Sequence, residues 1–248
     1  MRNTFLIVTV LATLIWSPAH LRAQNVEPYF PTEEMPDLIQ CLPAPPDSLS
    51  AAFTYDIMRY QWGKTQRQDP ETAARVCRDA VWTYEALLAE FWAPFGMVIS
   101  KEATPEIWKV LETSLATVDQ TRIAPKAYYH RKRPFEVFGE KTLTGEDEEL
   151  RGEGSYPSGH TIRSWLVAYL LSEINPEAAN RLFARAYSYS ESRVIAGCHW
   201  QTDIDASRLA AGIGYCRLQT SPLFREDMTR AQEAYRAVTA ASKPALAL

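Results

Sequence analysis

Gly154-Ser-Tyr-Pro-Ser-Gly-His-Thr-Ile-Arg-Ser-Trp-Leu-Val-Ala-Tyr-Leu-Leu171 joins a turn to a run of apolar residues with helical spacing. The spacing predicts a helix that begins near His160. Its apolar positions are Trp165, Leu166, Tyr169 and Leu170. Because the first amides of a helix lack partners within it, the turn at Ser158 and Gly159 offers N–H groups, a hydroxyl and a positive dipole end to an oxyanion. An ordinary loop with a helix cap is the alternative interpretation.

Four further helix starts share one pattern, a capping residue followed by proline. The cap side chain accepts a bond from a free amide, and proline in the first helical position loses no hydrogen bond. The pairs are Asp69-Pro70, Thr104-Pro105, Asn175-Pro176 and Ser221-Pro222. After the first, helical spacing runs through Val76, Val81, Leu87 and Leu88. Further helices are expected at 47–67, 202–219 and 222–240, and no alternating strand pattern is evident. We predict an all-α, single-domain bundle of about seven to nine helices.

Two stretches are predicted to be irregular. Residues 24–46 contain six prolines and are expected to wrap the surface. Residues 135–159 contain five of the ten glycines and an acidic run at 146–149. A loop of this length inside a compact helical domain is usually functional or disordered.

The composition excludes several classes of protein. Of the 248 residues, 46% are hydrophobic and 23% are charged, so the chain can form a sizeable core and is not disordered. A net charge of −4 argues against a strongly basic nucleic-acid-binding surface. A mean hydropathy of −0.25 argues against several membrane spans.

The N-terminus has the pattern of a secretory signal peptide at residues 1–23. Arg2 is followed by an apolar run of 12 residues from Phe5 to Trp16, which is short for a bilayer span. We expect cleavage after Ala23, with Ala19 as the second choice, and a single mature domain at 24–248. The mature protein would be periplasmic or secreted and free of the membrane; a retained anchor is the alternative.

Four cysteines in an exported chain raise the question of disulfides. Cys41, Cys77, Cys198 and Cys216 allow three pairings, and none of them forms a CxxC zinc motif. A helix over 202–219 would separate Cys198 from Cys216 by on the order of 20 Å, which disfavours that pair. The connectivity stays open.

Two basic residues, Lys126 and Arg133, form the first candidate cluster. Seven residues at 100° each amount to about 700°, so one helix would place both on the same face, with Pro134 ending it. Both side chains can then bind one anion. A solvated basic face is the alternative, because His130, Arg131 and Lys132 lie between them.

The second cluster is the turn already quoted. Glycine at 159 permits close approach of a ligand to the backbone, and His160 stands where it can protonate a leaving group.

The third cluster contains Arg193, His199 and Asp203. His199 and Asp203 are four residues apart, so on a helix the carboxylate can reach the imidazole and fix its tautomer. Gly197 offers a break that lets Arg193 point into the same site. A structural hydrogen bond between His199 and Asp203 is the alternative.

Together the clusters read Lys-x6-Arg-Pro, Pro-Ser-Gly-His and Ser-Arg-x5-His-x3-Asp, separated by 22 and 31 residues. This arrangement resembles the superfamily of type 2 phosphatidic acid phosphatases and vanadium haloperoxidases. The longer string at 154–161, with Leu42-Pro-Ala-Pro-Pro46, Glu173-Ile-Asn-Pro176 and Glu191-Ser-Arg-Val-Ile195, resembles the class A bacterial non-specific acid phosphatases in particular. The sequence departs from the pattern of this family at two positions, Pro125 before Lys126 and Cys198 before His199.

The resemblance implies a helical fold and a role for each matching residue. His199 would attack phosphorus and form a phosphohistidine, Asp203 would orient it, and His160 would protonate the leaving group and then activate water. The phosphoryl oxygens would be bound by Lys126, Arg133, Ser158, Gly159 and Arg193. No metal or other cofactor is implied, and His130 has no role.

The resemblance also implies partners and activity. The substrates would be small phosphate monoesters such as nucleotides, sugar phosphates or aryl phosphates, with inorganic phosphate as product and vanadate as inhibitor. Transfer to an alcohol in place of water would give phosphotransferase activity. A homo-oligomer is expected. A vanadate-dependent haloperoxidase-like oxyanion site is the alternative. A lipid phosphate phosphatase would need several membrane spans, which the mean hydropathy argues against. A helical binding or structural protein would not need all the signature residues that are present here.

Overall fold

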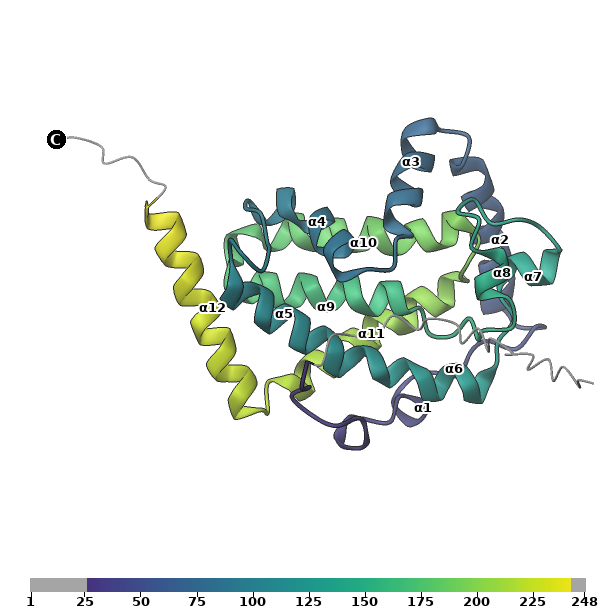
Figure 1. Ribbon diagram of the computed structural model, residues 1–248. Helices are drawn as coiled ribbons and strands as arrows, with labels where there is room; N and C mark the ends of the chain where they lie inside the picture. Colours follow the sequence, from purple (N-terminus) through teal and green to yellow (C-terminus); the bar gives the residue numbers. More distant parts are fainter. Residues whose placement is uncertain (1–25, 242–248) are drawn as a thin grey trace, which may run out of the picture.

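The computed structural model describes residues 26–241, and within that range the chain forms helices and no strand (Figure 1). The all-α prediction is confirmed. The expected signal peptide at 1–23 lies outside the described residues. The described part contains eight helices of ten residues or more, namely α2 (Ala51–Gln66), α3 (Pro70–Asp79), α4 (Tyr84–Phe95), α5 (Pro105–Asp119), α9 (Gly159–Ile174), α10 (Ala179–Ala196), α11 (Gln201–Leu218) and α12 (Pro222–Ala241). The shorter helices are α1 (Leu38–Cys41), α6 (Ile123–Tyr129), α7 (Pro134–Phe138) and α8 (Asp147–Leu150), with 3-10 turns η1 (Thr32–Glu34), η2 (Gln120–Arg122) and η3 (Pro176–Ala178).

Helix α9 forms the centre of the bundle because it is buried on nearly every face. Ile162, Leu166, Val167 and Leu170 are each fully buried, and a helix that is apolar all round packs inside a protein. It packs against α10, α11 and α5 (Figure 1). The central helix therefore carries the quoted turn at its N-terminus into the interior.

The predicted caps begin helices in the structure, with two differences in detail. Asp69 accepts a bond of 2.8 Å from the amide of Thr72, and Ser221 accepts one from the amide of Phe224. Thr104 precedes α5, but its hydroxyl accepts from the amide of Ser100 instead of capping the helix. Pro176 begins a 3-10 turn before α10.

The apolar spacing after Asp69 spans two helices instead of one. Helix α3 ends at Asp79, and Thr83 then caps α4 by accepting a bond of 3.2 Å from the amide of Ala86. The apolar period runs through both segments, so periodicity alone does not show the break. Similarly, the region 135–159 contains the short helices α7 and α8.

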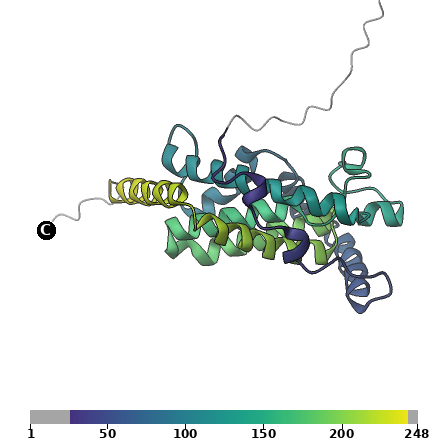
Figure 2. The ribbon, with the colours of Figure 1, turned by 90° about the horizontal axis from the view of Figure 1, so that it is seen from below.

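The short helices gather at one end of the bundle. In Figure 1, α7 and α8 lie beside α2 at the right, α6 runs below them toward the same end, and α12 lies at the opposite end; Figure 2 shows α12 at the far end from below. The N-termini of α9 and α11 and the C-terminus of α10 also point to the end that holds α8. Among residues 26–241, no helix is long and apolar enough to cross a membrane.

Candidate active site

The candidate site forms where α10 ends and α11 begins. Gly197 ends α10 in a left-handed conformation with φ of 85°, which side chains rarely adopt. The break turns the chain sharply, so that Arg193 in the last turn of α10 and His199 in the connection lie in one buried region. Asp203 follows in the first turn of α11. The break predicted at Gly197 is therefore present, although His199 precedes α11 instead of lying on it.

His199 contacts a basic residue and an acidic residue through its two ring nitrogens. Its Nε2 lies 3.1 Å from Nη1 of Arg133, and its Nδ1 lies 3.3 Å from Oδ2 of Asp203. A guanidinium can only donate, so Nε2 must accept and therefore carries a lone pair. The proton of the neutral ring is then on Nδ1, where it is donated to Asp203. This tautomer leaves the lone pair on Nε2.

The surroundings keep this imidazole neutral and its partner charged. Burial, followed by the positive charge of Arg133, lowers the pKa of His199 well below its usual value, although Asp203 acts in the opposite direction. Burial by itself raises the pKa of Asp203, but the Arg131 guanidinium and the contacts with His199 and Ser155 outweigh it and hold that pKa far below its usual range. The imidazole of His199 thus stays neutral below its usual pKa.

Arg133 and Lys126 meet at the site, but not by sharing one helix. Helix α6 ends at Tyr129, His130 adopts a left-handed conformation with φ of 43°, and Arg133 precedes the next helix α7. The expectation of one helical face over 126–133 is therefore wrong: the helix ends at His130, which is exposed, and residues 131–133 are not helical, with Arg133 extended.

A close backbone contact brings the two cations together. A Cβ at Gly154 would clash with the carbonyl of Lys126, so only glycine allows this approach. Nζ of Lys126 then donates to the Gly154 carbonyl at 2.5 Å, and Nη2 of Arg133 reaches the same oxygen at 3.5 Å. Arg133 also donates to the carbonyl of Cys198 at 2.9 Å. The glycine before the Ser-Tyr-Pro sequence thus joins the first two clusters.

A carboxylate bridges these two cations. Glu153 lies 3.2 Å from Lys126 and 3.6 Å from Arg133. Burial, followed by the charge of Arg133, lowers the pKa of Lys126 to about 8, despite the opposing effect of Glu153. The carboxylate stands where an anionic ligand would be expected to bind the same side chains.

Arg193 is the most deeply buried of the three predicted cations of the site. Its side chain is fully buried, and its Nη2 lies 3.0 Å from each carboxylate oxygen of Glu146. Its Nε and Nη1 have no hydrogen-bond partner among the described residues. Buried N–H groups of an arginine are rarely left unpaired. These two nitrogen atoms could therefore bind an anion.

The turn that starts α9 holds His160 on the other side of the site. Ser158 caps α9, and its Oγ accepts from the amide of Thr161 at 3.5 Å. His160 lies against the ring of Trp82 at 4.5 Å between centroids, and its Nε2 lies 3.1 Å from the carbonyl of Ala80. Burial, followed by the charge of Arg193, lowers its pKa well below the usual value, while the Ala80 contact acts in the opposite direction. Gly159 packs against Trp82, where a Cβ would be too close.

The structure adds residues that the motifs did not identify. They are Arg131, Ser155, Glu146, Glu153 and Trp82, which contact Asp203, Arg193, Lys126 or His160 as described. The acidic run at 146–149 was the available signal for Glu146. Ser155 lies in the quoted string at 154–161, where it has no assigned role. Arg131, Glu153 and Trp82 lack a motif, because only the fold brings them to the site.

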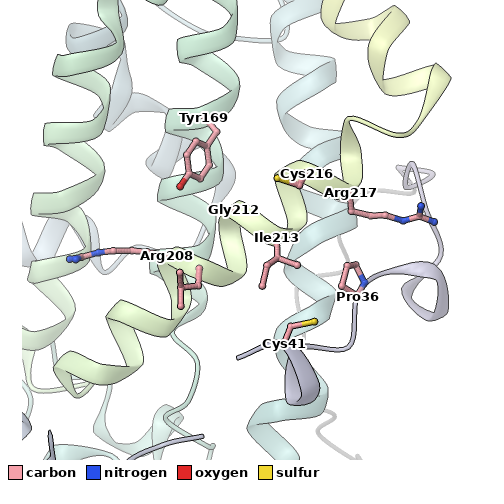
Figure 3. Close-up of a pocket in the computed structure, with 9 residues that line it drawn as sticks. Pro36, Cys41, Tyr169, Arg208, Gly212, Ile213, Cys216 and Arg217 are labelled. Atoms are coloured by element: carbon pink, nitrogen blue, oxygen red, sulfur yellow. The ribbon is translucent and has the colours of Figure 1, made fainter. Parts of the chain in front are cut away.

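The cysteines, possible metal sites and surface groove of the described residues add nothing to this site. The four cysteines are unpaired in the structure, and only Cys198 is buried. Residues 26–241 contain no group of three or more His, Cys, Asp or Glu that could hold a metal ion. A surface groove between α11 and residues 36–41 is lined by Pro36, Ile213 and Cys216 among others, and none of the predicted site residues lines it (Figure 3).

Comparison with known proteins places these features in a family. The model of the PAP2 superfamily matches residues 106–221, which include every predicted site residue. The non-specific acid phosphatase of Salmonella typhimurium is 37% identical over 213 residues, covering 85% of each chain. That of Providencia stuartii is 34% identical over 209 residues and 84% of each chain. The acid phosphatase of Zymomonas mobilis is 28% identical over 237 residues, covering 95% of this chain and 89% of its own. The chain therefore belongs to the PAP2 superfamily, together with the bacterial non-specific acid phosphatases that it resembles over most of its length.

Proposed function

We propose that the protein is an acid phosphatase that hydrolyses small phosphate monoesters through a phosphohistidine at His199. The observation that carries the proposal is that buried Arg193 has two nitrogen atoms without a hydrogen-bond partner, in a site where Arg133 holds Nε2 of His199 as a hydrogen-bond acceptor. Phosphoryl transfer needs positively charged groups that bind the oxygens of the transferred group, and a nucleophile in line with the leaving group. The names of the similar proteins support the same activity.

In the first half-reaction, Nε2 of His199 attacks phosphorus and the bond from phosphorus to the ester oxygen breaks. The leaving alkoxide takes a proton from His160, while Lys126, Arg133 and Arg193 bind the phosphoryl oxygens. The amide of Gly159 and the hydroxyl of Ser158 are the neutral donors at the start of α9. Asp203 accepts the Nδ1 proton of His199 in a hydrogen bond and stabilises the ring as it becomes charged.

In the second half-reaction, water attacks the phosphohistidine and gives its proton to His160. The N–P bond breaks, phosphate leaves and Nε2 regains its lone pair. An alcohol in place of water would take the phosphoryl group and produce a new ester.

Substrate binding is expected to prepare His160 for its role as an acid. In the free site, burial and Arg193 favour the neutral ring. A phosphate ester dianion bound at Arg193 offsets that positive charge and raises the pKa of His160, so that the ring takes up a proton in acid solution. The general acid is therefore formed when the substrate is bound.

We also propose that the mature protein is periplasmic or secreted, forms a homo-oligomer and needs no metal ion. Three cationic side chains supply the charge that a metal would otherwise provide. The test is hydrolysis of p-nitrophenyl phosphate by the purified protein in EDTA, with inhibition by vanadate. Loss of activity on chelation that a divalent ion restores would contradict the metal-free mechanism. Vanadate-dependent oxidation of bromide without ester hydrolysis would favour the haloperoxidase alternative.

A further inference from the structure

We propose that Arg131 is a positioning residue for His199, acting through Asp203. The inference rests on the proposed function, because it assigns the group that sets the orientation of the proposed nucleophile. Arg131 does not contact His199 in the structure. Its guanidinium instead lies on the side of Asp203 that faces away from the imidazole.

The two oxygens of Asp203 have separate partners. Nη1 of Arg131 donates to Oδ1 at 2.5 Å. The other oxygen, Oδ2, accepts from the amide of Trp200 at 2.9 Å and from the hydroxyl of Ser155, and it faces Nδ1 of His199. With Oδ1 bound by a cation, the carboxylate is held in one orientation and presents Oδ2 to the imidazole.

Arg131 is itself held by a second carboxylate. Its Nη2 donates to Oδ2 of Asp56 at 2.7 Å, and its Nη1 also donates to the hydroxyl of Thr202 at 2.8 Å. Asp56 accepts from the amide of Thr202 at 2.8 Å, which fixes it to the first turn of α11. Asp56 and Asp203 are both fully buried. The guanidinium is thus clamped between two buried carboxylates, one of which contacts the proposed nucleophile.

The clamp has a consequence for the chemistry of His199. A buried carboxylate without a cation takes up a proton more readily, and a protonated Asp203 loses its charge and with it the preference for the tautomer that carries the Nδ1 proton. Only the Arg133 guanidinium at Nε2 then still favours the Nδ1–H form, so part of the molecules carry the proton on Nε2, where it blocks attack. Arg131 keeps Asp203 charged and so keeps the lone pair on Nε2.

A purely structural role would join the segment 130–133 to α11 and nothing more. The two roles predict different results. Loss of a structural tie lowers activity equally at every pH, whereas loss of the positioning group changes the tautomer of His199 and moves the acid limb of kcat/KM.

The test compares Arg131→Gln and Arg131→Lys with Arg59→Gln. Arg59 is a matched control, because it also binds a carboxylate, Glu191, and a residue at the start of α11, Gln201, without touching Asp203. We expect Arg131→Gln to lower kcat about 10²-fold, the cost typical of a misplaced catalytic group, with a smaller change in KM. Its acid limb should move to higher pH, because the coupled pair of Asp203 and His199 takes up a proton more readily without the cation, while Arg133, Lys126, Arg193 and Asp56 are unchanged. Arg131→Lys keeps the charge and should restore the limb with part of kcat.

The tautomer is measured directly by long-range ¹H–¹⁵N correlation spectra of the histidine rings, which need no turnover. The wild type and Arg59→Gln should show His199 with a single Nδ1–H form, and Arg131→Gln a mixture. If Arg131→Gln does not fold, Asp56→Asn is measured instead; it removes the anion that shares Arg131 with Asp203, so its acid limb should move to lower pH, and an unmoved limb would count against the proposal. An unchanged tautomer and acid limb in the folded variant would overturn the proposal. An inactive wild type with the expected tautomer change would contradict the phosphatase function but support the role of Arg131.

Discussion

Buried Arg193 and partly buried Glu146 form an ion pair in which both carboxylate oxygens lie 3.0 Å from the same guanidinium nitrogen. The carboxylate occupies one edge of the cation that the mechanism assigns to the phosphoryl group, and Nε and Nη1 stay unpaired. Substrate must therefore either share Arg193 with Glu146 or displace it.

Glu146→Gln should strengthen phosphate binding, because it removes an anion that competes with the ligand. We expect the inhibition constant for inorganic phosphate to fall about tenfold, which corresponds to about 1.4 kcal/mol. The free protein should also melt at a lower temperature, since an unpaired buried charge is costly. Glu148→Gln, in the same acidic run but with its side chain 84% exposed, is the control. Weaker phosphate binding in Glu146→Gln alone would show that Glu146 supports the site.

The pKa of Lys126 predicts the basic limb of the pH profile. A lysine with a pKa of about 8 is charged below that pH and loses its proton above it. Because kcat/KM reports the free enzyme, it should fall as the pH rises through 8. Lys126→Arg keeps its charge and should move this limb to higher pH, whereas Lys126→Gln should lower kcat/KM about 10²-fold at pH 6. A limb at the same pH in Lys126→Arg would assign it to another group.

Replacement of His160 should depend on the leaving group. An aryl ester releases a phenolate, which needs little protonation. With such an ester, His199 should be phosphorylated in His160→Asn at a rate close to that of the wild type. With an alkyl ester the rate should fall much further. General acid catalysis accounts for about 10²- to 10⁴-fold in such reactions. Burst kinetics with the two ester classes measure the difference. An equal loss for both classes would contradict the role of His160 as the acid.

The two buried histidines should also make the protein less stable in acid. Their pKa values are lowered in the folded state, so the unfolded chain binds protons first as the pH falls below about 6.5. Each histidine then costs up to about 1.4 kcal/mol of unfolding free energy per pH unit. Urea unfolding at several pH values between 7 and 5 gives the unfolding free energy at each pH. This free energy should fall less steeply with decreasing pH in His160→Asn than in the wild type. Equal slopes would mean that His160 is protonated in the folded protein.

Much of the fold is predictable from the sequence because its signals are local. The Asp69 and Ser221 caps and the apolar run after His160 depend only on neighbouring residues, and each marks a helix in the structure. The break at Thr83 is less visible, since the apolar spacing from Val76 to Leu88 continues across it.

The composition of the candidate site is only partly predictable, because several contacts come from distant segments. The motif spacing identifies Lys126, Arg133 and Arg193, but the left-handed His130 ends the helix between the first two, so they do not meet along one helix. Glu146 and Glu153 have no motif, and their contacts with these cations depend on how the segment 139–153 folds back.

The most direct test of the account is to trap the covalent intermediate. The wild type, mixed with ³²P-labelled ester and quenched in alkali within milliseconds, should carry label that is stable to base and labile to acid, as expected for a phosphohistidine. Peptide mapping should place it on His199, and His160→Asn should accumulate more of it, since the water-activating base is lost. His199→Ala should carry none and should lose turnover. Label on His160 in the wild type, or a stable phosphoenzyme in His199→Ala, would contradict the assignment of His199 as the nucleophile.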